Sequence, residues 1–313
     1  MIGLGLASSH ATAMFCPAEY WPTVYAGIPE YMKGSQPDTA KLETPEVIQQ
    51  QIARLEKNFA RLRDEIAAYK PDALIYVGDD QNDMFNASNN PTFAVFTGDE
   101  VWGATVPRYL GQDPKDSRLH VPVHSDLAKR IHKGLIKRDF DVANCSKMQP
   151  LGHSERGVSH MLIFPHPKLV PNNDIPVIPI FINQYFPPLP SAKRCWALGK
   201  AIADILKDGP ERVAIYASGG LSHDPLGPRA GWIDEAMDNW ILERLERGEQ
   251  AELQNLFTFD SASLRGGSAE IRSWITVAAA LDRPAKRIDY FPSHHAKTGL
   301  AWAYWPEERA GQR

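Results

Sequence analysis

The chain has 313 residues, 43% of them hydrophobic and 23% charged, a composition that supports a sizeable core and argues against disorder. Its 34 basic and 38 acidic residues give a net charge of −4, which excludes the strongly basic surface expected of a protein that binds nucleic acid or an anionic membrane. The three cysteines, Cys16, Cys145 and Cys195, have no CxxC spacing, which argues against a disulfide framework and a zinc–thiolate site. Residues 1–15 do not resemble a signal peptide, and no window approaches the about 18 consecutive apolar residues of a membrane span. We therefore expect a soluble, cytoplasmic protein.

Predicted strands and helices alternate along the chain. Residues 1–7 form the first expected strand. Thr44 and Pro45 are typical of a helix start, and the apolar residues that follow have the spacing of one helical face: Ile52, Leu55, Phe59, Leu62 and Ile66. Further strands are expected at 73–77, 175–182 and 212–217, and further helices at 125–141, 191–208, 231–248 and 268–281. This alternation, without an internal repeat or linker, predicts one α/β domain over residues 1–313.

Polar side chains follow three of the predicted strands. His10 follows the first strand, Asp79-Asp80-Gln81 follow the second, and Ser222-His223 follow the fourth. Sites in α/β sheets gather beyond strand ends, so these residues are candidates. Glu270, near the start of the last predicted helix, is another, although a carboxylate there also favours the positive end of the helix dipole. A purely structural, hydrogen-bonded role is equally open for His10.

The position of His223 is the most constrained of these. It lies in "SGGLSHDPLGPRAG", residues 218–231, directly after a predicted buried strand. Two adjacent glycines let the backbone turn sharply and bring the next side chain to the rim of the sheet. The pattern therefore favours a functional role for His223 over a simple turn.

Several segments together resemble the class III extradiol ring-cleavage dioxygenases, whose best-known member is the catalytic subunit of protocatechuate 4,5-dioxygenase. The segments occur in the family's order over nearly the whole chain: "SSHATAM", "PDALIYVGDDQNDMF", "PTFAVF", "INQYFPPLPSAKRCWALGKAI", "SGGLSHDPLGPRAG" and "GGSAEIRSWITVAAAL". The resemblance implies a single α/β domain with mixed β-sheets flanked by helices. It also implies a reaction in which both atoms of O₂ enter a catecholic ring beside its two hydroxyl groups.

The resemblance implies specific roles for the residues at the strand ends. His10 and Glu270 match two of the family's Fe(II) ligands, and a facial triad with open positions suits such an oxygenase. His223 matches the family's acid–base histidine, whose pKa near neutrality lets it accept and donate a proton.

Gln81 departs from the best-known family pattern, because "DDQ" replaces the "NDH" that contains the second iron histidine. An amide oxygen binds Fe(II) more weakly than an imidazole does. Three interpretations stay open. Gln81 ligates the metal, Asp80 or another residue supplies the ligand, or the metal site is weakened or lost.

Other polar residues match family positions that contact substrate. His160, in "VSHMLIF", matches a histidine near the substrate hydroxyl or oxygen, although a buried structural histidine is the alternative. His153 and His166 flank the same region, and an alignment could match either of them, in place of His160, to the family's histidine. His295 and Lys297, in "SHHAKTG", lie where the family contacts the substrate carboxylate, although a solvated loop would explain each one alone.

The resemblance predicts an Fe(II)-dependent extradiol dioxygenase. Its substrates would be O₂ and a small aromatic diol, with carboxylated rings of the protocatechuate or gallate type as one option, and it would form a homo-oligomer or a complex with a second subunit. A catalytically silent subunit that keeps the fold for assembly is the main alternative, favoured by Gln81 and opposed by His10, His223 and Glu270 together. A metal-dependent hydrolase on a related scaffold has less support.

Overall fold

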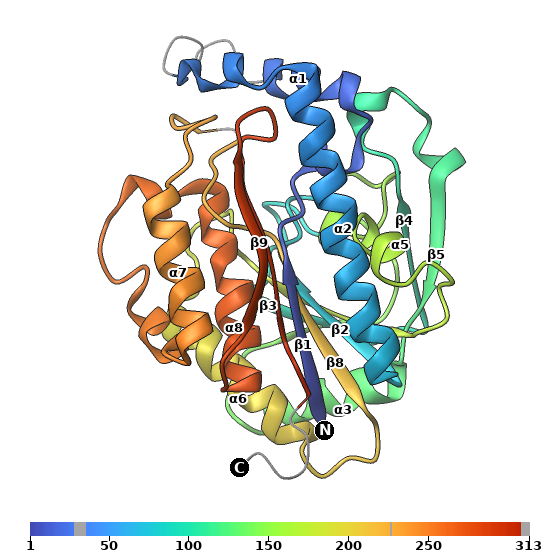
Figure 1. Ribbon diagram of the computed structural model, residues 1–313. Helices are drawn as coiled ribbons and strands as arrows, with labels where there is room; N and C mark the ends of the chain where they lie inside the picture. The colour runs from blue at the N-terminus through green and yellow to red at the C-terminus, as the bar shows by residue number, and fades with distance from the viewer. Residues whose placement is uncertain (28–35, 226, 308–313) are drawn as a thin grey trace.

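The computed structural model describes residues 1–27, 36–225 and 227–307, and its centre is an eight-stranded mixed sheet (Figure 1). The strand order is β6-β3-β7-β2-β8-β1-β10-β9. The bounds of these strands in chain order are β1 Ile2–Ser8, β2 Ala73–Gly78, β3 Phe93–Phe96, β6 Ala143–Cys145, β7 Val177–Ile182, β8 Val213–Ser218, β9 Lys286–Ser293 and β10 Thr298–Trp305. A separate antiparallel pair consists of β4 (Glu100–Ala104) and β5 (Arg118–Pro122).

Four neighbouring strands in the middle of the sheet, β7, β2, β8 and β1, are parallel. Their residues are buried on both faces, as the apolar and β-branched runs predict. Because parallel strands end at the same edge of a sheet, the segments that follow all four strands come together there. The antiparallel strand β10 begins at this edge beside β1.

Helices cover both faces of the sheet (Figure 1). The bounds are α1 Trp21–Ala26, α2 Pro45–Tyr69, α3 Ser125–Ile136, α4 His160–Ile163, α5 His166–Leu169, α6 Ala192–Leu206, α7 Glu235–Arg247 and α8 Ile271–Leu281. Side chains of α3, α6, α7 and α8 share one hydrophobic cluster with Ile75 and Ile215. Those of α1, α2, α4 and α5 share a second cluster with Leu74 and Tyr76. Successive strand residues therefore point into opposite layers of helices, which confirms the predicted α/β class.

The predicted elements agree with the structure in kind and differ at their ends. Helix α2 begins after Thr44, whose hydroxyl accepts from the backbone N–H of Val47, as the capping pattern predicts. The last predicted helix starts later than expected, because a 3₁₀ turn over Gly266–Glu270 precedes α8. Sequence periodicity does not predict the β9–β10 hairpin. Throughout the described ranges, every helix is too short or too polar to cross a bilayer.

Candidate active site

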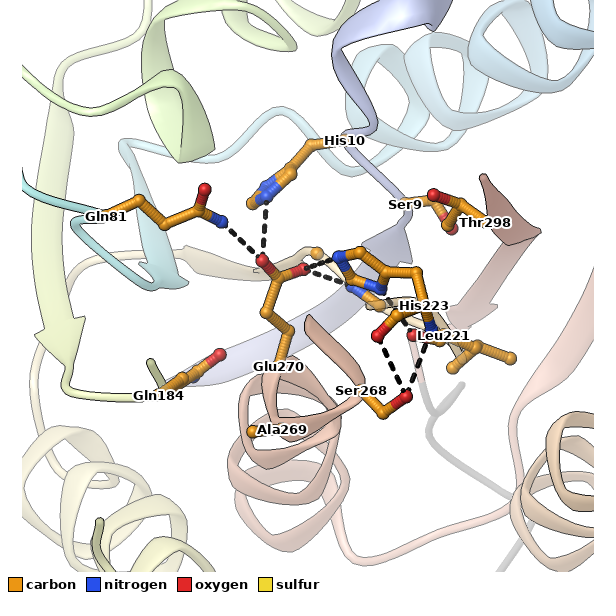
Figure 2. A network of polar contacts seen from close by, with 12 residues as sticks. Ser9, His10, Gln81, Gln184, Leu221, His223, Ser268, Ala269, Glu270 and Thr298 are labelled. Atoms are coloured by element: carbon orange, nitrogen blue, oxygen red, sulfur yellow. Dashed lines mark hydrogen bonds and ion pairs between the residues drawn. The ribbon is translucent and has the colours of Figure 1, made fainter. Parts of the chain in front are cut away.

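Three parallel strands and one turn place the predicted residues at a single edge of the sheet. His10 follows β1, Gln81 follows β2, His223 follows β8, and Glu270 ends the 3₁₀ turn before α8. Figure 2 shows Gln81 and His10 on one side of the Glu270 carboxylate and His223 on the other. His10, Gln81 and His223 line a small cavity of about 60 Å³, whose wall also includes His160 and Lys297.

The Glu270 carboxylate is the centre of this cluster and is fully buried. Its Oε1 accepts from Gln81 Nε2 at 2.5 Å and lies 3.4 Å from His10 Nε2. Its Oε2 accepts from the Gly220 backbone N–H at 2.6 Å and lies 3.6 Å from His223 Nε2. Burial by itself would raise the pKa of Glu270, but His10 and His223 outweigh burial and hold this pKa at about 2. The carboxylate is therefore an anion in the middle of the site.

Two glycine turns let the backbone and side chains approach this closely. Gly219 and Gly220 have φ angles of 116° and 69°, a region that L side chains rarely adopt, as the Gly-Gly turn predicts. A Cβ on Gly219 would overlap Oε2 of Glu270. A Cβ on Gly267 would overlap the imidazole of His223. A residue with a side chain at either position would therefore clash with the cluster, which is the steric reason for a glycine there.

His10 presents an unpaired nitrogen to the site. Its Nδ1 lies 2.9 Å from Ser218 Oγ, a contact that fixes the ring. Its Nε2 is buried without a hydrogen-bond partner and faces Glu270. In the neutral ring, with Nδ1 protonated toward Ser218, Nε2 would be free to bind a metal ion, and without a metal a protonated Nε2 would pair with the Glu270 anion.

His223 is held in one tautomer. Its Nδ1 lies 2.8 Å from the Leu221 carbonyl oxygen and donates to it, because a carbonyl can only accept. In the neutral ring Nε2 is therefore an acceptor, and the Tyr185 hydroxyl lies 3.2 Å from it. Tyr185 follows β7, and a polar residue at that strand end is the signal by which the sequence could have indicated it. His223 thus directs a basic nitrogen at the cavity.

Gln81 reaches the cluster through a strained backbone position, with φ at 51°. Its amide nitrogen faces Glu270, so rotation of the amide would bring the oxygen to the same place. Both carboxylate oxygens of Asp80 instead accept from the backbone N–H groups of Asp83, Met84 and Phe85. Asp80 therefore shapes the loop, which argues against it as the alternative ligand.

His160 lies beside His10, with the ring centroids 4.6 Å apart. Its Nδ1 is 3.7 Å from Asp83 Oδ2, and the other oxygen of Asp83 contacts His153 Nδ1 at 3.1 Å. Burial and the neighbouring His10 lower the pKa of His160, which favours its neutral form. His166 is separate, because its ring nitrogens contact Tyr76 and Asn173.

Lys297 and His295 lie in the β9–β10 turn and differ in their surroundings. Lys297 lines the small cavity and is only 3% exposed. Burial, and to a smaller extent Arg108, lowers its pKa to about 8. His295 instead contacts Glu43. The Nδ1 atom of His295 lies 2.7 Å from Glu43 Oε2, and the same oxygen accepts from the backbone N–H of His295. His295 does not line the small cavity, so its predicted substrate contact has no direct geometric support.

The donors at this edge fit a divalent metal. In residues 1–27, 36–225 and 227–307, no group of three His, Cys, Asp or Glu side chains could hold a metal ion. The fit depends on a mixed set that includes an amide: the free Nε2 of His10, the Glu270 carboxylate and the Gln81 side chain. One nitrogen and two oxygens are acceptable to a first-row divalent ion, with weaker binding than a set with two imidazoles.

A second, larger cavity of about 690 Å³ adjoins the first. Thr12, Gln81 and His160 line both cavities. The larger one extends over the segments after β4 and before α4, where Arg108 and Arg156 contribute to its wall. Neither arginine lies in a regular sequence pattern, so local periodicity gives no signal for them.

Comparison with known proteins identifies the family. Residues 37–300 match the model of the catalytic LigB subunit of aromatic ring-opening dioxygenases. The chain belongs to this family. The predicted resemblance is thereby confirmed.

Relatives of the LigB-family chain include 2,3-dihydroxyphenylpropionate/2,3-dihydroxicinnamic acid 1,2-dioxygenases. The protein from Cupriavidus necator is 29% identical over 65% of this chain and 60% of its own length. The protein from Photorhabdus laumondii is 27% identical over 82% of this chain and 90% of its own length. The gallate dioxygenase of Pseudomonas putida is 28% identical over 61% of this chain and 55% of its own length. The chain spans about 60% of the length of the first of these relatives, and it spans similar shares of several other 2,3-dihydroxyphenylpropionate/2,3-dihydroxicinnamic acid 1,2-dioxygenases.

The fold is also found in a solved structure. The crystal structure of an uncharacterized protein from Escherichia coli K12 superposes with a TM-score of 0.51 at 13% identity, over 96% of this chain and 99% of that one. At this identity the likeness concerns the fold alone.

Proposed function

We propose that this chain, as one catalytic domain, cleaves the ring of a catecholic diol beside its two hydroxyl groups and adds both atoms of O₂. Membership of the LigB family and the names of its relatives support ring opening of a dihydroxylated aromatic. The observation that supports it most directly is that His10, Gln81 and His223 line one small cavity and all approach the buried carboxylate of Glu270.

Fe(II) would be held by His10 Nε2, by Glu270 and by the amide oxygen of Gln81. When bound, the ion would bring the diol and O₂ together and supply the one-electron chemistry that O₂ requires. Ser218 would keep His10 in the tautomer that leaves Nε2 free. The Gly220 backbone N–H would fix the second oxygen of Glu270.

His223 would take a proton from a diol hydroxyl. Its Nε2 is the acceptor of the neutral ring, because Nδ1 donates to the Leu221 carbonyl. Glu270 Oε2, 3.6 Å away, would stabilise the resulting imidazolium. The same nitrogen could later return the proton to an oxygen of the opened ring.

Lys297 and His160 would complete the recognition of the diol. Lys297 is a buried cation that lines the same cavity as His223, and in the described ranges it makes no ion pair. Its charge would stabilise the diol oxygen as the proton leaves. His160, mostly neutral, would contact the substrate hydroxyl or oxygen and be positioned by Asp83. A role for His295 would be indirect, through the turn that Glu43 holds.

Ring cleavage can be tested with the metal-loaded protein. The protein is loaded anaerobically with Fe(II), mixed with a panel of catechols and exposed to O₂, while a yellow product and O₂ uptake are recorded. One O₂ consumed per diol, with two ¹⁸O atoms in the product from ¹⁸O₂, is the expected result. No product from any catechol, although iron is bound stoichiometrically, would contradict the proposal.

The silent-subunit alternative is favoured by one observation, the amide at position 81 with its nitrogen toward Glu270. In that case the cluster would be held together by the Gln81–Glu270 hydrogen bond and would not bind iron. Iron content after anaerobic loading separates the two functions, because the silent subunit should retain none.

A further inference from the structure

The peptide between Leu221 and Ser222 connects His223 to a buried carboxylate on α7. Its carbonyl oxygen accepts from His223 Nδ1 at 2.8 Å (Figure 2). Its N–H, which points to the opposite side of the same planar group, donates to Asp238 Oδ1 at 2.9 Å. Asp238, the peptide and the imidazole therefore form one chain of hydrogen bonds, and Nε2 of His223 at its end is directed at the cavity.

Asp238 is held firmly, although its place is an unfavourable one for a charge. Its side chain is fully buried near the start of α7. Its Oδ2 accepts from the hydroxyl of Ser222 at 2.7 Å and from that of Tyr290 at 2.9 Å, and a Cβ on Gly299 would overlap the same oxygen. These donors are neutral, and burial raises the pKa of Asp238 to about 7. Stability alone therefore does not account for a carboxylate there.

Other contacts hold the backbone of this turn rather than the ring of His223. The Leu221 N–H donates to the Gly299 carbonyl, and the Gly299 N–H donates to the Ser222 carbonyl, each at 3.0 Å. On the other side, the His223 N–H donates to Ser268 Oγ at 3.0 Å. The contact that sets the Nδ1 side of the ring is the Leu221 carbonyl. A group that polarises this peptide therefore acts on the ring.

We propose that Asp238 is a positioning residue, which acts through the Leu221–Ser222 peptide to hold His223 with Nδ1 protonated and Nε2 toward the diol. This inference rests on the proposed function and adds a residue to it. Hydrogen bonds in a chain strengthen one another, so a carboxylate on the peptide N–H makes the carbonyl a better acceptor for Nδ1–H. In Ser-His-Asp triads a buried aspartate orients its histidine by direct contact. Here a peptide group lies between the two residues.

The ring N–H of His223 tests this contact without turnover. In a ¹H–¹⁵N spectrum of the histidine-labelled full chain, with Zn(II) added in place of paramagnetic Fe(II), the signal absent from His223→Ala belongs to this ring. At about pH 8 most of Asp238 is ionised. Asp238→Asn keeps the size of the side chain and removes its charge. It should move the signal upfield and speed its exchange with water about threefold or more, since a hydrogen bond to a charged group becomes one to a neutral group.

Turnover separates a role through His223 from a general one. Asp238→Asn should lower kcat for a cleaved diol by about tenfold, the lower end of the range for partners of metal-bound histidines, and leave KM within about twofold. In a His223→Ala background, the same change should lower kcat by less than about twofold, because residues that act through one another are not additive. A second variant without the charge, Asp238→Ser, also loses the contact and should show larger effects.

Asp289→Asn is the matched control. Asp289 lies on β9, and its carboxylate accepts from Arg54 and Asn58 of α2 rather than from the turn. This variant also exchanges a bonded carboxylate for an amide, but it should leave the N–H signal of His223 and kcat unchanged.

Each outcome bears on one proposal. A His223 signal that does not move in the folded Asp238→Asn or Asp238→Ser protein overturns the inference. An equal loss of kcat with and without His223 overturns it as well, because Asp238 would then have a general structural role. If the wild type cleaves no diol, the N–H signal still decides whether Asp238 acts on His223, and ring cleavage alone is contradicted.

Discussion

Replacing Glu270 by glutamine tests the centre of the candidate site. The change keeps the size of the side chain but removes the anion that His10, His223 and the Gly220 N–H stabilise. The pKa of about 2, against an ordinary value of 4.5, corresponds to about 3 kcal/mol of folding stability at neutral pH. For a chain of this length, that loss lowers the melting temperature by about 5 °C. We also expect Glu270→Gln to lose bound iron.

The stability that the Glu270 carboxylate contributes should depend on pH in a defined direction. A carboxylate whose pKa is lowered in the folded state stabilises the fold fully above its unfolded pKa, and this stabilisation is lost as the pH falls toward the folded pKa. The difference in melting temperature between wild type and Glu270→Gln, measured without metal, should therefore be full at pH 6 and fall to less than half near pH 3. Differential scanning fluorimetry and iron analysis provide the two measurements.

Glu43→Gln is the matched control for this experiment. Glu43 is also buried and paired with a histidine, His295, but it does not contact the His10 cluster. The control should lose stability and keep its iron. A melting-temperature difference for Glu270→Gln that does not change with pH, or iron retained at the wild-type stoichiometry, would refute the reasoning.

Three other changes test the surrounding residues. His223→Ala should keep iron and fold but slow turnover by about 10²–10⁴-fold, the range for a lost acid–base group, and near wild-type turnover would make its turn purely structural. Gln81→His should bind Fe(II) more tightly than wild type and Gln81→Ala should lose iron or activity; a Gln81→Ala protein with full iron and turnover would place the third ligand elsewhere. The pKa of Lys297 near 8 predicts that kcat/KM for a neutral diol falls as the pH rises through 8, because the cation is lost, and that Lys297→Arg moves this fall to higher pH. An unchanged pH profile in Lys297→Arg would contradict the role of that cation.

Local patterns in the sequence were sufficient for the α/β class and for the family. The 3.6-residue repeat over residues 45–66 and the apolar runs before Gly78 and Ser218 depend only on neighbouring residues, and the structure contains these elements nearly where they are expected. The Gly-Gly turn is also local, because positive φ angles require glycine at Gly219 and Gly220. The motifs also predict the family, which the match over residues 37–300 confirms. The roles of the individual site residues stay predictions.

Tertiary structure decided which of these residues meet, because their contacts join segments far apart in the chain. His10 and Ser218 are 208 residues apart and meet at the ends of two parallel strands, whereas Gln81 and Glu270 are 189 apart and meet because the turn before α8 lies at the same edge of the sheet. Periodicity cannot predict that Glu43 binds His295 while Lys297, two residues later, faces the cavity. It also cannot place Arg108 and Arg156 in one wall, since Arg108 lies in a short 3₁₀ turn and Arg156 in a loop, 48 residues apart in the chain. Local sequence fixes the direction of the backbone over a few residues, whereas the chemistry of the site depends on distances that exist only after the sheet has assembled.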